Sequence, residues 1–211
     1  MLRIWNAYLH TRATYDRIGC LKAKQHSYVH ASFASLVASS LNNDATMKIG
    51  LLADTHGWLD ERIFHHFKDC DELWHAGDIG TVAVAQRLAA FKPLRAVYGN
   101  IDGQDIRIDY PQDQGFVREG LHVWMTHIGG KPPRYNAAVR TALQKRVPDI
   151  FVCGHSHLLR VMHDPKHPPL LYLNPGAAGQ TGFHKVRTLL RFVLSNKKVC
   201  HMQAIELGPR G

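Results

Sequence analysis

The feature that most constrains the fold is a series of short apolar segments, each followed at once by a polar or glycine-containing loop. In the first half these segments span residues 47–53, 71–76 and 94–98, and each has the length and content of a buried strand. Helical periodicity lies between them, after the first segment and again over residues 82–91. Strands that alternate with helices predict a layered α/β core with parallel strand pairing.

The second half of the chain is richer in strand patterns. A helix is expected over residues 136–147, where Pro148 ends it. Asn196-Lys197 is expected to form a hairpin turn between the last two strands. The predicted strands are residues 121–126, 150–153, 158–163, 170–173, 188–194 and 199–205.

Length and composition narrow the class of protein. The 211 residues suffice for one compact domain, and no apolar stretch has the ~18 residues of a membrane-spanning helix. The four cysteines are scattered without a C-x-x-C pair, which favours a reducing, cytoplasmic compartment. The formal net charge is +9, and a basic surface can raise the local concentration of phosphate-bearing ligands or mark a nucleic-acid binder. No dense Lys/Arg run or nucleic-acid motif accompanies it, so a solvated basic surface is the preferred interpretation of that charge.

Residues 1–46 are weakly patterned, apart from a small-residue stretch at 31–41 that has helical character. They hold five Lys/Arg and two Asp/Glu, and we expect them to be disordered and without a catalytic role. Three explanations stay open: an upstream extension with Met47 as the true start, a targeting peptide, or a regulatory arm. The first is favoured, because a complete fold pattern follows Met47 directly.

Candidate metal-ligating and catalytic residues stand in the loops that follow five predicted strands. In open α/β sheets the carboxyl ends of strands meet at one crevice, so these loops are expected to converge. A glycine before three of the candidates is expected to let the backbone turn without Cβ strain. The candidates are Asp54, His56, Asp78, Asn100, His127, His155 and His157.

Imidazole, carboxylate and amide groups together suit a pair of divalent transition metals. Two ions about 3.5–4 Å apart clamp the attacking and leaving oxygens of an in-line displacement and generate hydroxide near neutral pH. Each motif alone is weak, but their order is specific: D-x-H, G-D, G-N, T-H and G-H-x-H, each after an apolar strand.

In this order of motifs the chain, from Met47 to about Leu207, resembles the calcineurin-like metallophosphoesterase superfamily, and within it the small YfcE-like phosphodiesterase branch. The resemblance implies a four-layer α/β/β/α sandwich, in which helices flank two mixed sheets, over residues 47–211. It also places the Asn174-Pro175-Gly176 turn near the site. By motif, the first metal would be held by Asp54, His56 and His157. The second metal would be held by Asn100, His127 and His155, with Asp78 as the bridge.

One departure from the larger members of the family affects the predicted chemistry. They carry G-N-H-D/E, whose histidine is thought to protonate the leaving group, whereas this chain reads Gly99-Asn100-Ile101-Asp102. A positioned general acid contributes ~10²–10⁴-fold to the rate. The resemblance therefore implies hydrolysis of phosphate esters by metal-bound hydroxide, preferably of phosphodiesters with good leaving groups.

The expected cofactors are two divalent metal ions, Mn²⁺ first, with Ni²⁺, Zn²⁺ or Fe as alternatives. The expected partner is a small phosphoester rather than a membrane or a nucleic acid, and homo-oligomerisation stays open. A metal-binding scaffold of the retromer-subunit type is the competing hypothesis, and completeness of the ligand set favours the enzyme. A nuclease is the third hypothesis, disfavoured because the G-N-H motif and extra domains are missing.

Several other residues have two interpretations. His75 would orient a ligand or be an ordinary core histidine, and Lys131 and Arg134 would contact phosphate or sit on a solvated loop. Trp58 would wall the site or pack in the core. Seven further histidines are interpreted as packing or surface residues: His65, His66, His122, His163, His167, His184 and His201.

Overall fold

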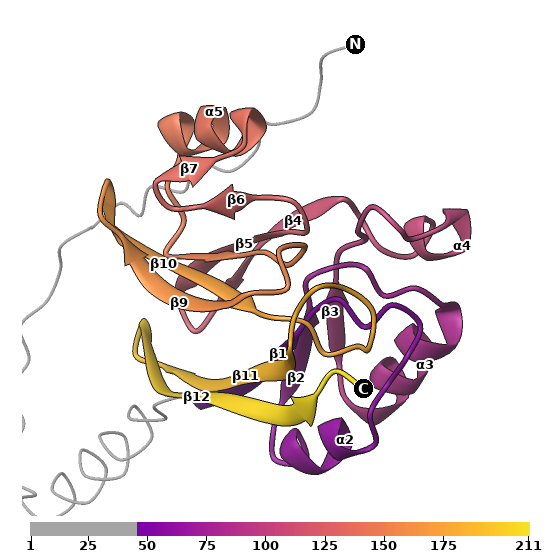
Figure 1. Ribbon diagram of the computed structural model, residues 1–211. Helices are drawn as coiled ribbons and strands as arrows, with labels where there is room; N and C mark the ends of the chain where they lie inside the picture. Colours follow the sequence, from indigo (N-terminus) through magenta and orange to yellow (C-terminus); the bar gives the residue numbers. More distant parts are fainter. Residues whose placement is uncertain (1–45) are drawn as a thin grey trace, which may run out of the picture. The chain divides into compact units, whose positions relative to one another are not determined.

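The computed structural model describes residues 46–211, which contain two five-stranded sheets (Figure 1). The first sheet has the order β12-β11-β1-β2-β3. The strands β1, β2 and β3 run parallel, whereas β11 pairs antiparallel with both β1 and β12, so the sheet is mixed. Its strands are β1 (Thr46–Leu52), β2 (Glu72–His75), β3 (Leu94–Ala96), β11 (Val186–Ser195) and β12 (Lys198–Pro209).

The second sheet has the order β4-β5-β8-β10-β9 and is also mixed. The strands β5, β8 and β10 run parallel, and β4 and β9 close the two edges antiparallel. A small hairpin of β6 (Gly130–Lys131) and β7 (Arg134–Tyr135) lies beyond it. The strands are β4 (Asp113–Arg118), β5 (Leu121–Thr126), β8 (Ile150–Val152), β9 (Leu159–Asp164) and β10 (His167–Pro175).

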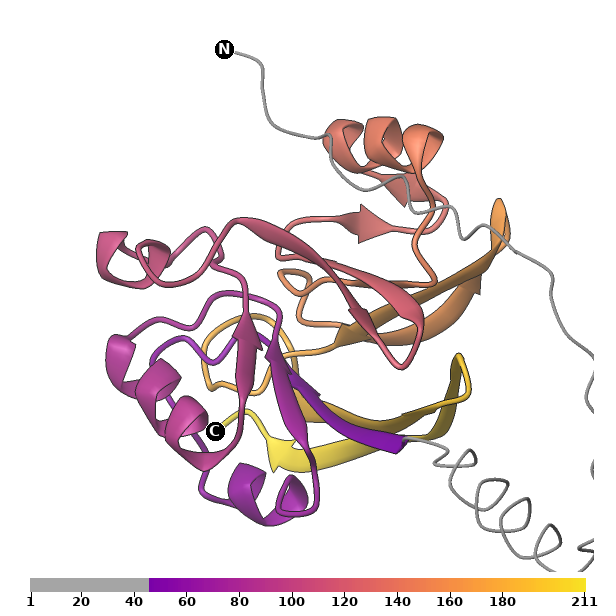
Figure 2. The same cartoon turned by 180° about the vertical axis from the view of Figure 1, so that it is seen from behind.

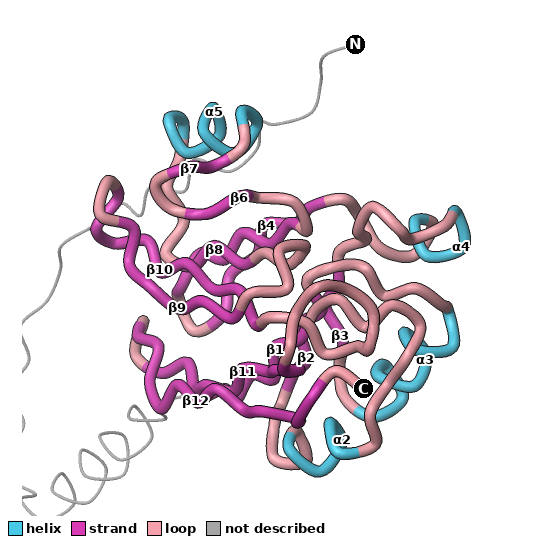
Figure 3. Tube along the Cα trace, viewed as in Figure 1, coloured by secondary structure: helices cyan, strands magenta, loops and turns pink. Residues whose placement is uncertain are grey.

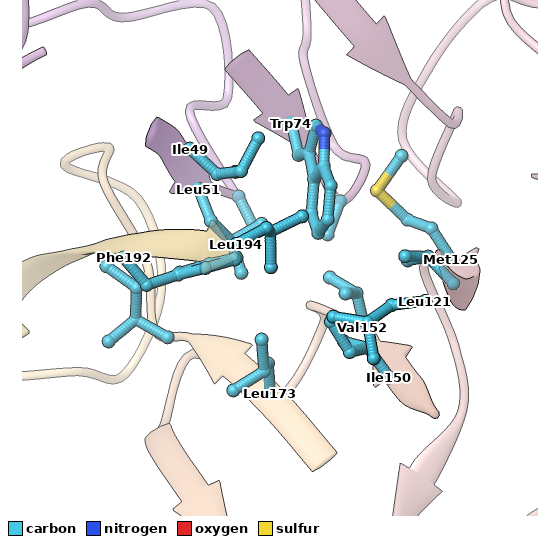
Figure 4. Close-up of a cluster of buried hydrophobic side chains, with 14 of the residues drawn as sticks. Ile49, Leu51, Trp74, Leu121, Met125, Ile150, Val152, Leu173, Phe192 and Leu194 are labelled. Atoms are coloured by element: carbon cyan, nitrogen blue, oxygen red, sulfur yellow. The ribbon is translucent and has the colours of Figure 1, made fainter. Parts of the chain in front are cut away.

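The main hydrophobic core lies between the two sheets (Figure 4). Trp74 on β2 is fully buried and packs edge-to-face on Phe116 and Phe192, with ring centroids 5.2 and 5.5 Å apart. Aromatic pairs in this geometry add about 0.5–1.5 kcal/mol to the burial of their area. Strands from both sheets supply this core, and it therefore holds the two layers together.

Helices cover the outer faces of the sheets. Neighbouring residues of one strand point to opposite faces, so Leu52 on β1 packs with Ile63 of α2 (Arg62–His66) and Leu88 of α3 (Val82–Phe91). On the other side, Phe151 of β8 packs with Leu143 of α5 (Ala137–Lys145). Figures 2 and 3 show that these outer helices are few and short. The expected α/β/β/α sandwich of two mixed sheets is confirmed.

Turn chemistry also follows the sequence. Asn196 and Lys197 have φ angles of 50° and 57°, as a two-residue hairpin between twisted strands requires, and they join β11 to β12 as expected. Side chains cap two helices: the Thr81 hydroxyl accepts from the Val84 amide, and the Asn136 side chain accepts from the Val139 amide. These caps satisfy amides that have no partner inside the helix.

Several elements differ from the prediction. The strand β4, the β6–β7 hairpin and the short helix α4 (Gln104–Arg107) were not predicted, and α2 is shorter than its periodicity indicated. β12 runs to Pro209, beyond the predicted end at residue 205. The predictions for residues 1–45, including helical character at 31–41, lie outside the described residues. Within residues 46–211, no helix is long and apolar enough to cross a membrane.

Candidate metal centre

The sheets bring the predicted ligands together at the carboxyl ends of their strands. Six of the seven form two clusters, and within each cluster the candidate ligand atoms lie within 4.8 Å of one another. The seventh, Asn100, follows β3 and lines a cavity together with His127. The first cluster contains Asp54, His56 and His157, and the second contains Asp78, His127 and His155.

Backbone hydrogen bonds lock the loops side by side. The amide of Asp54 donates to the Gly77 carbonyl at 3.0 Å, and the amide of His56 donates to the Asp78 carbonyl at 3.0 Å. The loop after β8 is fixed in the same way, because the Gly154 amide donates to the His127 carbonyl at 3.1 Å. The ligand positions are therefore set by main-chain pairing that continues the sheets.

Five of the seven predicted ligands adopt positive φ angles, which lie between 50° and 65°. Non-glycine residues rarely occupy this region, and each such residue costs on the order of 1–3 kcal/mol. Strain of this kind concentrates at functional sites, where the surrounding structure imposes it. The five residues are Asp54, His56, Asp78, His155 and His157.

The expected role of the preceding glycines needs correction. Of the three glycines, only Gly77 has a positive φ, of 92°, and in the loop after β8 the positive φ falls on His155 itself. Gly99 and Gly154 are required for close approach instead. A Cβ at Gly99 would collide with the Asp78 carboxylate, and one at Gly154 would lie 3.0 Å from Asp54 Oδ2.

Asp78 is positioned between the two clusters. Its Oδ2 atom lies 3.2 Å from His127 Nε2 in its own cluster and 3.7 Å from His56 Nε2 in the other. Asp54 has a similar but more one-sided position, because its Oδ1 atom lies 3.3 Å from His157 Nε2 and 4.0 Å from His127 Nε2. Both carboxylates thus face ligands of both clusters, and Asp78 is the more evenly placed of the two.

Two buried polar atoms at the centre have no hydrogen-bond partner among the described residues. They are Asp54 Oδ2 and His127 Nε2, in side chains that are 0% and 2% exposed. Since His127 Nδ1 donates to the Ala76 carbonyl at 2.8 Å, the neutral ring directs a lone pair from Nε2 into the site. Unsatisfied buried atoms of this kind are costly. A cation would satisfy both, so the donor set fits a metal site.

The charges are arranged to keep Asp78 ionised. Burial alone would raise the pKa of Asp78, but the His127 ring and the Ile101 amide outweigh burial and lower the pKa. Burial alone would likewise lower the pKa of His127, while Asp78 and Asp54 reverse this and raise it. Burial and the charge of His127 lower the pKa of His155. The lowered pKa of His155 favours the neutral ring that binds a metal, whereas the raised pKa of His127 shows how strongly the two carboxylates attract positive charge at this position.

The family model of the calcineurin-like phosphoesterase superfamily domain matches residues 47–197. The chain belongs to this superfamily. A probable metallophosphoesterase of Methanothermobacter thermautotrophicus is 28% identical over 138 residues, which cover 62% of this chain and 77% of the relative. One from Methanocaldococcus jannaschii is 26% identical over 138 residues, or 63% and 68% of the two chains.

Solved structures of the same fold include proteins with different descriptions. A novel archaeal phosphodiesterase has a TM-score of 0.60 at 22% identity, over 76% of this chain and 100% of that chain. Vps29 of Chaetomium thermophilum has a TM-score of 0.58 at 15% identity, over 77% and 99%. At these identities the likeness shows the fold. Superfamily membership supports phosphoester hydrolysis and the use of divalent metals as the general class of chemistry.

In this calcineurin-like domain, the last residue of the G-N-x-D motif organises the loops. Asp102 is buried, and its carboxylate accepts hydrogen bonds from the amides of Ile79, Gly80 and Gly99 at 3.1, 2.6 and 2.7 Å. These amides belong to the loops after β2 and β3. Asp102 therefore fixes Asp78 and Asn100 relative to each other without pointing at the clusters.

His75 supports the site through Thr55. Its Nδ1 atom accepts from the Gly77 amide at 3.2 Å, so Nε2 carries the proton and lies 3.0 Å from the Thr55 hydroxyl. The hydroxyl in turn donates to the Ile79 carbonyl at 2.9 Å. Burial lowers the pKa of His75 to about 4, which keeps this chain of hydrogen bonds neutral. His75 thus combines both of its expected interpretations: it is a core residue that orders two ligand loops.

Among the other residues near the clusters, one lies where it was expected and one has a contact that the sequence did not predict. Asn174 lies where the resemblance placed it, and its amide donates to the Gly154 carbonyl at 2.8 Å and the Ser156 hydroxyl at 3.1 Å. His184 was interpreted as an ordinary packing residue, yet its ring contacts His157, with 3.2 Å between their Nδ1 atoms. Trp58 is not part of the main core. The Arg187 guanidinium lies over its indole ring, with Cζ 4.7 Å from the ring centroid.

Proposed function

We propose that this protein hydrolyses phosphate esters, preferably phosphodiesters, with two divalent metal ions. The observation that carries the proposal is the pair of adjacent ligand clusters, with Asp78 Oδ2 only 3.2 Å from an imidazole nitrogen of one cluster and 3.7 Å from an imidazole nitrogen of the other. Superfamily membership supplies the general class of reaction. The buried unpartnered atoms Asp54 Oδ2 and His127 Nε2 give an independent reason to expect cations there.

The proposed ligand sets follow the clusters, except that Asn100 joins the second set and Asp78 is shared between the two. Asp78 lies between the two sets. Two divalent ions bound there would supply an activated water and neutralise the charge that develops on the phosphoryl oxygens. The mixed nitrogen and oxygen donors suit Mn²⁺, Ni²⁺, Zn²⁺ and Fe, and Mn²⁺ is the metal proposed first. The first set is Asp54, His56 and His157, and the second is Asn100, His127 and His155.

The preference for good leaving groups rests on Ile101. This residue occupies the position of the family's histidine, and its side chain is 45% exposed. Its amide donates to Asp78 Oδ1 at 3.1 Å, so the backbone supports the centre while the side chain has no proton to donate. Esters whose leaving group departs without protonation are therefore the proposed substrates.

The first experiment is metal analysis of the purified protein, followed by a panel of aryl and alkyl phosphoesters with added Mn²⁺, Ni²⁺ or Zn²⁺. We expect close to two ions per chain, turnover of aryl phosphodiesters, and loss of turnover with a chelator. Metal-independent turnover, or two bound ions with no turnover of any ester, would contradict the proposal.

A metal-binding scaffold is the second candidate function, since solved Vps29 proteins share the fold. One of them, from Entamoeba histolytica, is described as a complex with Zn²⁺ and has a TM-score of 0.52 at 14% identity, so a bound metal alone does not separate the two functions. The discriminating result is turnover. A protein that binds two ions, hydrolyses no ester and is retained by a partner protein would be a scaffold.

A further inference from the structure

A basic cavity opens directly beside the second ligand cluster. Its volume is about 350 Å³, and it shares Gly154 and His155 with the metal centre. The small β6–β7 hairpin, the G-H-S-H loop and the start of β9 enclose it. The lining residues are Gly130, Lys131, Arg134, Gly154, His155, Ser156, Leu158, Arg160 and Tyr172.

All the charged side chains that line this cavity, apart from the histidine, are cationic. Lys131, Arg134 and Arg160 line it, and no Asp or Glu does. Within residues 46–211, none of these three cations lies within ion-pair distance of a carboxylate, although five other arginines do. Cations that converge without a counter-charge raise the local concentration of anions and favour an anionic ligand.

The cations are carried by well-anchored backbone. The Tyr172 hydroxyl donates to the Gly130 carbonyl at 2.9 Å at the start of the hairpin. At its end, the Tyr135 hydroxyl donates to the buried Asp164 at 2.8 Å. Arg160 lies on β9, opposite Asn174 in the register with β10. An anion in the cavity would therefore be bound by groups whose backbone positions are already set.

We propose that this cavity binds a second phosphate of the substrate, so that the preferred ester is one that carries a further phosphate on the group it retains. The inference rests on the proposed hydrolysis at the adjacent centre. The shared residue His155 puts the cavity next to the scissile phosphate, and guanidinium groups suit phosphate because they donate two parallel hydrogen bonds. A cavity of about 350 Å³ also has room for the organic group that joins the two phosphates.

The test uses two esters with the same leaving group. Thymidine 5′-(4-nitrophenyl phosphate) is compared with its 3′-phosphorylated form, using the Mn²⁺-loaded full chain. We expect kcat/KM to be ~10-fold or more higher for the phosphorylated ester, which is the scale of a charged hydrogen bond. Equal kcat/KM for the two esters would overturn the proposal.

Variants assign the preference to the cavity. Arg160→Gln and Arg134→Gln are each expected to lower the ratio of the two kcat/KM values ~10-fold, whereas Arg140→Gln, an exposed residue on α5, leaves the ratio unchanged. A cavity variant that lowers both kcat/KM values equally would show a general effect on the site and overturn the assignment.

A binding measurement separates this inference from the proposed function. Calorimetry with thymidine 3′,5′-bisphosphate and thymidine 5′-monophosphate needs no turnover. If no ester is hydrolysed, the proposed hydrolysis fails. The anion site would still be supported if the bisphosphate binds more tightly than the monophosphate and Arg160→Gln abolishes that difference. Equal affinities for the two nucleotides would overturn it.

Discussion

The Nδ1 atom of His184 lies 3.2 Å from the Nδ1 atom of His157, and this contact determines which nitrogen of His157 faces the metal centre. His184 Nε2 lies 3.0 Å from the Gly179 carbonyl, which only accepts, so Nε2 carries the proton. Burial lowers the pKa of His184, so its neutral Nδ1 accepts from His157 Nδ1. The lone pair of His157 Nε2 is then directed at the cluster, 3.3 Å from Asp54 Oδ1.

His184→Ala is therefore expected to weaken binding of the metal at the first cluster ~10–100-fold, the usual effect of removing a partner that orients a ligand. Calorimetric titration of the metal-free protein with Mn²⁺ measures this directly. His184→Gln, whose side chain has both an acceptor and a donor, should recover part of the affinity. The exposed His163→Ala is the matched control, and a loss of equal size there would contradict the positioning role.

Asp78→Asn is expected to reduce bound metal below two ions per chain and to lower kcat by ~10²-fold or more. The substitution keeps the shape of the side chain but removes the negative charge that faces both clusters, and a metal ion contributes several kcal/mol to transition-state stabilisation. Metal analysis and turnover of an aryl phosphodiester give the two readouts. Two bound ions and full turnover in Asp78→Asn would show that Asp78 is not the bridge. The control is Asp69→Asn, which removes a negative charge from the exposed surface.

The substitution Ile101→His tests the source of the leaving-group proton. In the unsubstituted protein, kcat/KM should depend steeply on leaving-group pKa, because the Ile101 side chain donates no proton. A histidine at this exposed position should flatten the dependence and raise turnover of poor leaving groups by up to ~10²-fold. The control is Ile101→Leu, which adds no titratable group. A flat dependence before substitution would show that another group protonates the leaving oxygen.

The candidate ligands could be proposed from the sequence because their signals are local. Asp78, for example, follows an apolar strand and a glycine, and that short pattern is readable without any knowledge of distant residues. His184 carries no such pattern, since its role comes from a contact with a residue 27 positions away. Arg160 is similar: it reads as an ordinary strand residue until the hairpin with Lys131 and Arg134 is placed beside it.

The limits on predicting the fold have the same origin. The strand β4 contains Asp113, Gln114 and Gly115, so its own sequence favours a turn, and pairing with β5 decides its conformation. The β6–β7 hairpin is only two residues long on each side, too short for a periodic pattern. The sequence also did not show which residues would adopt strained backbone angles. The glycines were expected to make the sharp turns, but residues such as His155 and His157 adopt positive φ angles.

A buried ion pair just after the first ligand loop predicts how stability depends on pH. Asp60 accepts from Arg62, with its Nη2 at 2.5 Å, and from Arg187, with its Nη1 at 2.7 Å. Arg62 and then Arg187 outweigh burial and hold the pKa of Asp60 well below its usual range. Because Arg62 is 55% exposed, solvent screens its pair with Asp60, and that pair adds little to the free energy of unfolding. Asp60 and Arg187 are both nearly buried, so their pair is the one that matters for stability.

Asp60→Asn would leave the buried Arg187 without its counter-charge, so we expect a loss of ~3–5 kcal/mol in the free energy of unfolding at pH 7. Because the folded pKa of Asp60 is depressed, its contribution is complete above the unfolded pKa of about 3.9 and is lost as pH falls from there toward the folded pKa. The difference between the two proteins should therefore shrink below about pH 4. Urea unfolding at several pH values, with metal content held equal, measures this difference.

The control is Glu61→Gln, which removes an exposed pair with Arg87 and should change the free energy of unfolding by less than about 1 kcal/mol. A constant difference for Asp60→Asn at every pH would mean that packing, not the ion pair, stabilises this loop.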